Sequence, residues 1–298
     1  MGIISGLQNR VKTLTDSRYR HFYAQRRVTG MQERNAAADR LAATLPRPFQ
    51  SDDASEVTQK LDEHGYVMLP PLAASEVADM SAYFTGRMAY DSWQPDNPMF
   101  SAPDNAPPGT HVANFRHDAV VGAPHALAIA NNPIILSAVG RILGAKPTIS
   151  CMSAWWSIAH GEKAKEAELF HRDVDDYRFV KLFVYLTDVD ETSGPHSFVE
   201  GTHKVNKLTE VRRFSEDEIA REFAGKNLSF TGKAGTMFLE NTYGIHRGVP
   251  PKSKNRLLFQ VLYSLAAYIG GPKKPVAPYV ASQDGVSIDR YVNRVYLS

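Results

Sequence analysis

The chain has a single cysteine, Cys151, in 298 residues. One thiol excludes an internal disulfide framework and any metal centre built from several thiolates. The N-terminus has no apolar segment of the signal-peptide type, and we find no apolar run approaching the roughly 18 residues of a membrane span. These absences favour a reducing, cytoplasmic location and no membrane partner.

The chain also lacks a strong charge of either sign. Lys plus Arg number 34 against 32 Asp plus Glu, a formal net charge of +2. Such a balance gives no field that would select nucleic acid. With 43% hydrophobic residues, the chain is long enough for one large globular domain with embellishments. We therefore expect a small-molecule substrate and no nucleic-acid partner.

The domain organisation follows from a shift in composition. Residues 1–50 carry nine Lys or Arg against three acids, which favours a basic, helical N-terminal extension, with an arm for an acidic partner as the alternative. Residues 51–298 read as a single domain with a core at about 147–265 and a C-terminal extension at 266–298. Both extensions are candidate contacts for a homodimer.

The first half of the domain alternates helical and irregular patterns. Residues 54–65 and 75–89 have the apolar spacing of amphipathic helices, and residues 66–71 between them read as a short strand. Residues 93–127 are rich in Pro, Gly, Asn and Asp, which is typical of a functional lid or of a disordered segment. A further helix is predicted within residues 130–147, closed by Gly144.

Beyond Pro147 the hydrophobic period shifts from 3.6 towards 2. One helix interrupts this pattern, where Ser215 and Glu218 form a capping box and Gly225 supplies a stop. The rest predicts an antiparallel β core and therefore a mainly β fold with flanking helices. The predicted strands are residues 148–159, 179–189, 227–231, 235–240 and 256–268.

His171 and Asp173 form a His-x-Asp pair. On a strand these two side chains share one face while Arg172 points away, although the pattern is common by chance. His246 follows the strand at 235–240, so a stacked sheet would bring it back to the pair. Two imidazoles and one carboxylate can hold iron and leave its other positions open.

Arg256 opens the next predicted strand, where alternate residues face inward. A guanidinium in an apolar cavity is costly without an anionic partner, because it cannot lose its proton. A dicarboxylate would supply that partner through a bidentate salt bridge.

With these residues in place, the chain resembles the phytanoyl-CoA dioxygenase family over about residues 55–265. The most specific segments are FHRDVDD…VKLFVYLTDVDETSGPHSFVEGTHK and GTMFLENTYGIHRGVPPKSKNRLLFQVLYS. The resemblance implies a double-stranded β-helix of the jelly-roll, cupin-like type and an iron(II)- and 2-oxoglutarate-dependent oxygenase. It places iron on His171, Asp173 and His246, the far carboxylate of 2-oxoglutarate on Arg256, and a supporting 2-oxoglutarate contact on Lys181.

Two turns depart from the family pattern. Glu200-Gly201-Thr202-His203 replaces the usual Pro-Gly-Ser-His, and Gly235-Thr236 replaces the usual Gly-Asp. Both shape turns, so the metal assignment is unaffected. The intact Asp173 disfavours a halogenase, since related halogenases have a small residue there. The resemblance then implies oxidation of an unactivated C–H bond, with O₂ consumed and succinate and CO₂ released; hydroxylation is the first choice, and desaturation or ring formation stays open. The lack of a clustered basic patch near the core favours a small metabolite or natural-product intermediate over a CoA ester.

Other interpretations stay open. A zinc or manganese hydrolase on the same three ligands would need a nearby general base, and no HExxH-like pattern supports it. A non-catalytic small-molecule binding module is the third alternative. Lys181 could instead be a strand-edge lysine in solvent.

Several polar residues have a plainer interpretation than a role in chemistry. His160 and His203 read as hydrogen-bonded surface histidines rather than metal ligands, and residues 175–177 read as a surface loop. His111 and His117, in the predicted lid, are candidates for substrate contact. Of Trp155 and Trp156, one should face the cavity and the other the outer packing layer.

Overall fold

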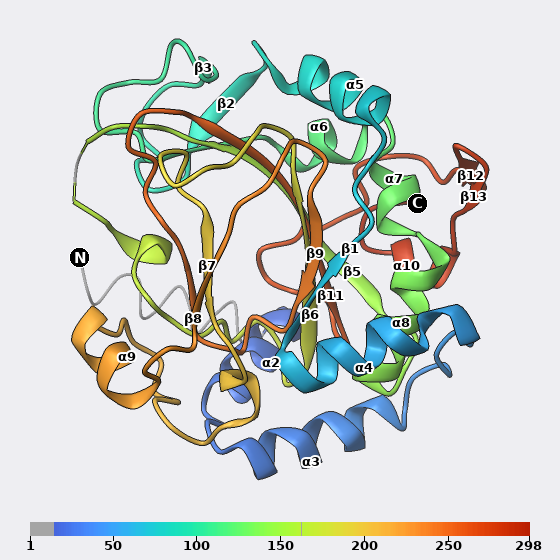
Figure 1. The fold of residues 1–298 in the computed structure, drawn as a ribbon. Coiled ribbons are helices and arrows are strands. Elements are labelled where there is room, and N and C mark those ends of the chain that lie inside the picture. The colour runs from blue at the N-terminus through green and yellow to red at the C-terminus, as the bar shows by residue number, and fades with distance from the viewer. Residues whose placement is uncertain (1–14, 162) are drawn as a thin grey trace.

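The computed structural model describes residues 15–161 and 163–298, so the first 14 residues of the predicted N-terminal extension lie outside it. Two antiparallel sheets face each other at its centre (Figure 1). The larger has the order β1-β9-β6-β11-β5-β4-β2-β3, and the smaller has the order β10-β7-β8. The strands are β1 (Tyr66–Leu69), β2 (Met88–Asp91), β3 (Phe100–Ser101), β4 (Val112–Asn114), β5 (Thr148–Ser157), β6 (Phe179–Tyr185), β7 (His196–Val199), β8 (Asn227–Phe230), β9 (Met237–Glu240), β10 (His246–Gly248) and β11 (Arg256–Ser264).

The two sheets pack through aromatic and aliphatic side chains that face inward. Phe183 and Phe238 of the large sheet stack with their ring centroids 5.0 Å apart, and Phe230 of the small sheet meets Phe238 edge-on at the same distance. Such pairs add to the stabilisation from apolar burial. The arrangement confirms the predicted mainly β fold with a double-stranded β-helix core.

Helices flank the β core, and their ends follow local sequence signals. Gly65 ends α4 in a left-handed conformation with φ 88°. Asn132 caps α8 by accepting hydrogen bonds from the next turn. The helices are α2 (Ser17–Arg26), α3 (Met31–Ala42), α4 (Ser55–His64), α5 (Ala74–Phe84), α6 (His117–Val121), α7 (Ala126–Ala130), α8 (Pro133–Leu143), α9 (Glu216–Glu222) and α10 (Arg290–Asn293).

Some predicted boundaries were wrong. The helix expected over 75–89 ends at Phe84, because Gly86 turns the chain with φ 78° and the following residues pair as β2. The helix expected from residue 130 is the shorter α8, which starts at Pro133 after the Asn132 cap and is closed by Gly144 as predicted; α7 is a separate helix before it. The capping box at Ser215 is confirmed, although α9 ends before Gly225.

The expectation of no long apolar stretch was also wrong. Ala126–Leu143, which spans α7 and α8, has the length and mean hydropathy of a membrane span. In this fold 72% of it is buried inside the protein, as in a core helix pair.

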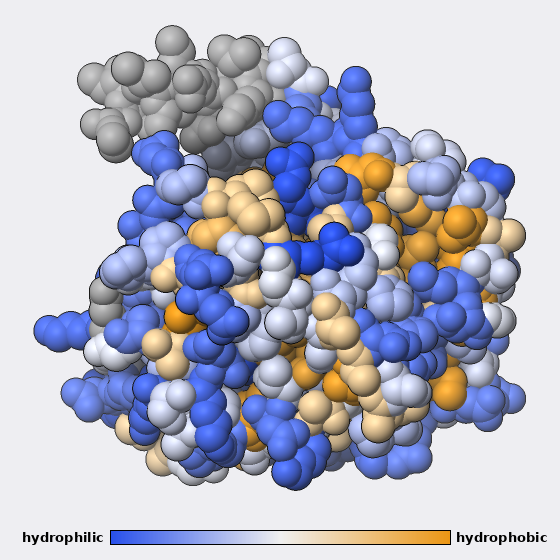
Figure 2. All heavy atoms as spheres, turned by 90° about the horizontal axis from the view of Figure 1, so that it is seen from above, coloured by the Kyte–Doolittle hydropathy of each residue, from blue (hydrophilic) through white to orange (hydrophobic). Residues whose placement is uncertain are grey.

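Figure 2 shows one face of the molecular surface, which is largely polar with apolar side chains gathered towards one side.

The C-terminal residues belong to the packed core. Ile288, Val292 and Tyr296 are almost completely buried in the main hydrophobic cluster, and the Tyr296 hydroxyl accepts a hydrogen bond from the Met152 backbone N–H in β5. A short hairpin of β12 (Ser282–Gln283) and β13 (Val286–Ser287) precedes them. Residues after 266 therefore support β5 from its outer side.

Candidate metal centre

His171, Asp173 and His246 meet inside the β core. The two oxygens of Asp173 lie 3.4 Å from Nε2 of His171 and 3.3 Å from Nε2 of His246. One ligand atom from each residue lies within 4.8 Å of both others. The structure thus brings together the three residues singled out in the sequence, at the spacing of ligands around one ion.

The opposite edge of each imidazole is fixed by the backbone. Nδ1 of His171 donates to the carbonyl of Leu169 at 2.8 Å, and Nδ1 of His246 donates to that of Gly244 at 2.9 Å. A hydrogen on Nδ1 leaves the lone pair on Nε2, which both rings turn towards Asp173. This donor set fits a divalent transition metal such as iron(II).

The His-x-Asp pair lies on an irregular segment, and the expectation of a strand was wrong. Only an isolated bridge joins it to β10, where the backbones of His171 and His246 exchange two hydrogen bonds of 3.0 Å. The N–H of Asp173 donates to the carbonyl of Thr242 at 2.9 Å. These bonds hold the dyad against the chain around His246 without a continuous ladder.

The charges of the triad depend on one another. Burial, with a contribution from His246, lowers the pKa of His171. Burial also acts against the charge on His246, but Asp173 outweighs it and raises the pKa of that imidazole. Burial would raise the pKa of Asp173, whereas Lys181 and then His246 hold it well below its usual range. Asp173 is therefore an anion ready to bind a cation.

Arg172, between the two ligands, points away from the cavity as expected and is buried. Its guanidinium joins the segment at residues 202–208 to the loop that holds Tyr243, and burial lowers its pKa to about 10. The acceptors are the backbone carbonyls of Thr202, Lys207, Leu208 and Tyr243.

We expect Arg172→Met to lower the free energy of unfolding by about 3–5 kcal/mol, because it leaves buried carbonyls without donors. Urea denaturation of the metal-free protein measures this. Arg116→Met is the matched control, since Arg116 is exposed and contacts only Asp118 at 3.7 Å among the ion pairs of the described residues. Equal unfolding midpoints for the two variants would show that Arg172 does not hold the loops.

Lys181, on β6, lies beside the triad. Its Nζ is 2.6 Å from Asp173 and 2.8 Å from Asp175. Burial opposes its charge, but the two carboxylates outweigh it and raise the pKa of the ammonium. The interpretation as a strand-edge lysine in solvent is wrong, as is that of a surface loop for Asp175 and Asp176, because all three are largely buried. In this structure Lys181 orients the carboxylate of Asp173.

Lys181→Met should destabilise the metal-free protein by about 3–5 kcal/mol, because two neighbouring carboxylates then share a buried site without a cation. The double variant Lys181→Met/Asp175→Asn removes one of these charges and should recover most of the loss. Thermal or urea unfolding of both variants tests this. A single variant as stable as the unmodified protein would contradict the role given to Lys181.

Arg256, at the start of β11, faces the same cavity. It is 4% exposed, and its Nη2 donates to the hydroxyl of Ser157 at 3.1 Å while its Nη1 donates to the carbonyl of Gly194. Its Nε has no hydrogen-bond partner among the described residues. Burial lowers its pKa, with Tyr185 and Glu168 partly offsetting this. A buried guanidinium with an unused donor favours an anionic ligand.

The cavity between the triad and Arg256 has a volume of about 190 Å³. Trp155 lines it while Trp156 packs in the main hydrophobic cluster, which confirms the predicted alternation. Its other walls include the side chains of Trp93, Val112, Phe183, Val249, Leu258 and Gln260. A mostly apolar wall with a few polar groups is typical of small-molecule sites.

Sequence reasoning missed a buried pair behind the triad. Nε2 of His196 lies 2.8 Å from a carboxylate oxygen of Glu240, which is wholly buried. Burial lowers the pKa of His196, with Glu240 acting in the opposite direction. The ring of His196 stacks on that of His246 at 5.5 Å and 22°. The pair therefore supports one of the candidate ligands from behind.

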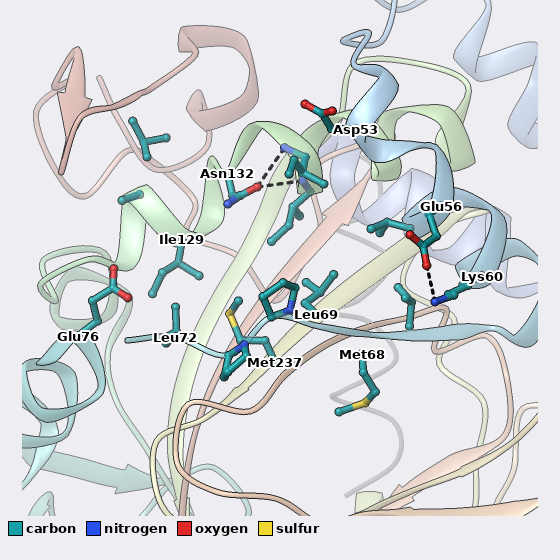
Figure 3. A pocket seen from close by; sticks show the side chains of 18 of the residues that line it. Asp53, Glu56, Lys60, Met68, Leu69, Leu72, Glu76, Ile129, Asn132 and Met237 are labelled. Carbon is teal, nitrogen blue, oxygen red and sulfur yellow. Dashed lines mark hydrogen bonds and ion pairs between the residues drawn. The ribbon is translucent and has the colours of Figure 1, made fainter. Parts of the chain in front are cut away.

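A second, larger cavity of about 570 Å³ lies elsewhere, between α4, β1 and the α7–α8 region (Figure 3). Carboxylates such as Glu56 and Glu76 lie around an apolar floor that includes Leu69 and Ile129 (Figure 3). None of the described residues that line it is a histidine, cysteine or arginine. The smaller cavity, with its converging ligands, is therefore the candidate functional site.

Two of the remaining histidines differ from expectation. His203 is buried, and its Nε2 lies 2.8 Å from the carbonyl of Asp62, so its interpretation as a surface residue is wrong. The same holds for His160, whose side chain is 4% exposed. His117 contacts the hydroxyl of Tyr296 at 3.2 Å, away from the triad. Its predicted substrate contact stays a prediction.

Comparison with known proteins agrees with this geometry. The profile of the phytanoyl-CoA dioxygenase family matches residues 61–256, which is more than half of the chain. No curated protein sequence matches.

Many solved structures share the fold, among them the following three. EctD from S. alaskensis, with 2-oxoglutarate and 5-hydroxyectoine, is 18% identical with a TM-score of 0.54, over 85% of this chain and 94% of its own. The α-ketoglutarate-dependent epimerase SnoN of nogalamycin biosynthesis is 17% identical with a TM-score of 0.50, and the match covers 82% of this chain and 95% of SnoN. HygX from Streptomyces hygroscopicus, with nickel and 2-oxoglutarate bound, is 14% identical with a TM-score of 0.50, and the match covers 80% of this chain and 96% of HygX. The structures agree in fold, and the family profile gives the assignment: the chain belongs to the phytanoyl-CoA dioxygenase family.

Proposed function

We propose that the protein is an iron(II)- and 2-oxoglutarate-dependent dioxygenase that hydroxylates an unactivated C–H bond of a small metabolite or natural-product intermediate. One observation carries the proposal. A His-Asp-His triad with two buried histidines and a buried arginine with an unused donor line the same cavity of about 190 Å³. A metal and a dicarboxylate together satisfy both groups.

Each residue has a defined task in this proposal. Nε2 of His171, Nε2 of His246 and the carboxylate of Asp173 would hold iron(II), and Arg256 would bind the far carboxylate of 2-oxoglutarate. Lys181 would keep Asp173 ionised and oriented for the metal, so its contribution to 2-oxoglutarate binding would be indirect, through Asp173 and the metal. When bound, the metal with 2-oxoglutarate and O₂ supplies an oxidant strong enough to attack a C–H bond, with succinate and CO₂ released.

The protein's own contribution is positioning and the exclusion of water. Trp93 and Trp155 line the cavity beside the triad, so the space around the metal is largely apolar. The ring of Trp93 also lies 5.1 Å from that of His111, which anchors one wall within the predicted lid at 93–127. A substrate held against this wall would meet the metal with little competing water.

Hydroxylation is the finer part of the proposal. Among the structural neighbours, one contains 5-hydroxyectoine and another is named an epimerase, so the shared fold serves more than one outcome. The intact carboxylate of Asp173 supports oxygen transfer over halogenation. A hydrolase would need a free general base, whereas Asp175 is bound by Lys181 and Glu240 by His196.

The setting of the enzyme is also proposed. The single cysteine and balanced charge support a cytoplasmic protein that acts on a small molecule, without nucleic-acid or membrane partners. A homodimer through the terminal extensions is a further proposal. Analytical ultracentrifugation of the full chain tests the dimer, and a monomer at micromolar concentration would contradict it.

Succinate release tests the proposed reaction. We expect the protein with iron(II), ascorbate and 2-oxoglutarate to release succinate slowly alone and faster with its substrate, so that a panel of small metabolites can be screened. His246→Ala should release none above background. Succinate release that is unchanged in His246→Ala, or absent under all substrates from folded and iron-loaded protein, would argue against the proposal.

A further inference from the structure

His111, His160 and Glu168 form a second cluster of metal-ligand type. His111 directly precedes β4, His160 lies just beyond β5, and Glu168 ends a short 3₁₀ turn (Glu166–Glu168). The backbone holds them in place, since the N–H of Ile158 donates to the carbonyl of His111 at 2.9 Å and the N–H of Lys165 donates to the carboxylate of Glu168 at 2.9 Å. Three separate segments thus converge on one point.

Their geometry parallels that of the first centre. Nδ1 of His111 and Nε2 of His160 lie 2.9 and 3.5 Å from the two oxygens of Glu168. In the first centre the corresponding distances to Asp173 are 3.4 and 3.3 Å. The ring centroids of His111 and His160 are 3.6 Å apart with an angle of 39° between the ring planes. For His171 and His246 the corresponding values are 4.3 Å and 49°.

We propose that this cluster is a second metal site, which binds Zn²⁺ or a similar divalent transition metal. Two histidine nitrogens and one carboxylate, with water at a fourth position, are a common zinc donor set. The site is enclosed, with His111 2% and Glu168 6% exposed, so a bound dication would compensate a carboxylate that is expensive to bury. Imidazole nitrogen is a favoured ligand of divalent transition metals such as zinc, which agrees with this choice of ion.

The position of the site gives the ion a structural task. Glu168 lines the same cavity as the triad and lies three residues before His171. His111 carries the ring against which Trp93 packs. A metal here would fasten the ends of β4 and β5 to the segment that leads into the first centre. The ion thereby fixes one wall of the cavity without taking part in the reaction.

The number of bound metal ions tests the proposal. Protein stripped with a chelator is incubated with excess Zn²⁺, desalted and analysed by mass spectrometry of the metal. We expect two ions per chain in the unmodified protein and one in His171→Ala/His246→Ala. Glu168→Gln should also retain one, and the three substitutions together none. The count in His171→Ala/His246→Ala is independent of the proposed dioxygenase activity, because that variant lacks the first centre.

Glu166→Gln is the matched control, because Glu166 lies in the same turn with its side chain 65% exposed and should leave two ions bound. Circular dichroism of each variant shows whether it is folded. Co²⁺ in place of Zn²⁺ reports the ligands directly, and its visible absorption in His171→Ala/His246→Ala should disappear when Glu168→Gln is added. A folded His171→Ala/His246→Ala protein without metal, or a Glu168→Gln protein with two ions, would overturn the proposal and leave a hydrogen-bonded cluster only.

Discussion

Asp173→Ala should abolish turnover and weaken iron binding, with a loss of activity on the order of 10³-fold or more, as for groups that act as one unit. The carboxylate contacts both imidazoles of the triad, so its removal takes away a ligand and the anion that compensates the metal charge. The change should leave the fold intact, because Lys181 still pairs with Asp175 at 2.8 Å. Succinate release and iron binding by equilibrium dialysis measure the two effects.

Asp175→Asn is the control for Asp173→Ala. It removes a buried carboxylate on the same lysine without removing a candidate ligand. We expect this variant to keep one iron ion bound at the His171-Asp173-His246 site and to retain most of its turnover. If Asp175→Asn lost as much activity as Asp173→Ala, the loss would reflect the charge around Lys181. If Asp173→Ala kept its iron affinity and its turnover, the triad would not be the metal centre.

Arg256→Ala is expected to raise the 2-oxoglutarate concentration needed for half-maximal turnover. A buried, charged hydrogen-bonded pair contributes about 2–4 kcal/mol, which corresponds to roughly 30- to 700-fold in affinity. The maximal rate at saturating 2-oxoglutarate should fall much less, because Arg256 anchors the far end of the cosubstrate and does not touch the reacting atoms. Steady-state kinetics over a wide range of 2-oxoglutarate separate the two parameters.

Two further variants sharpen the test of Arg256. Lys254→Ala removes a neighbouring cation that is exposed and paired with Asp190, and it should leave the 2-oxoglutarate dependence unchanged. Arg256→Lys keeps the charge but loses the planar fork, so an intermediate effect is expected. If the 2-oxoglutarate affinity of Arg256→Ala were unchanged, Arg256 would not be the residue that binds 2-oxoglutarate.

The sequence predicted the parts of the site that have a strong local signal. Strands β5 and β11 alternate or run apolar over nine or more residues, and both were expected at nearly their observed bounds. The His-x-Asp pattern was weak by itself, and only together with His246 and with Arg256 at a strand start did it predict that these residues share one cavity. The irregular backbone at His171 was missed, because an isolated bridge leaves no periodic pattern.

The environment of Lys181 could not be predicted, because every residue of β6 is buried and the strand shows no alternation of polar and apolar sides. Glu240 escaped notice for the same reason at the end of β9. The cluster of His111 and Glu168 joins residues 57 positions apart in segments without a regular period. Only the tertiary fold brings such residues together.

The most direct test of the central claim is the visible absorption of the protein after anaerobic addition of iron(II) and 2-oxoglutarate. Chelation of the metal by the keto acid at the triad should give a weak charge-transfer band, which should be absent in His246→Ala and should need more 2-oxoglutarate in Arg256→Ala. The account predicts this band in the unmodified protein. Its absence from well-folded, iron-loaded protein would contradict it.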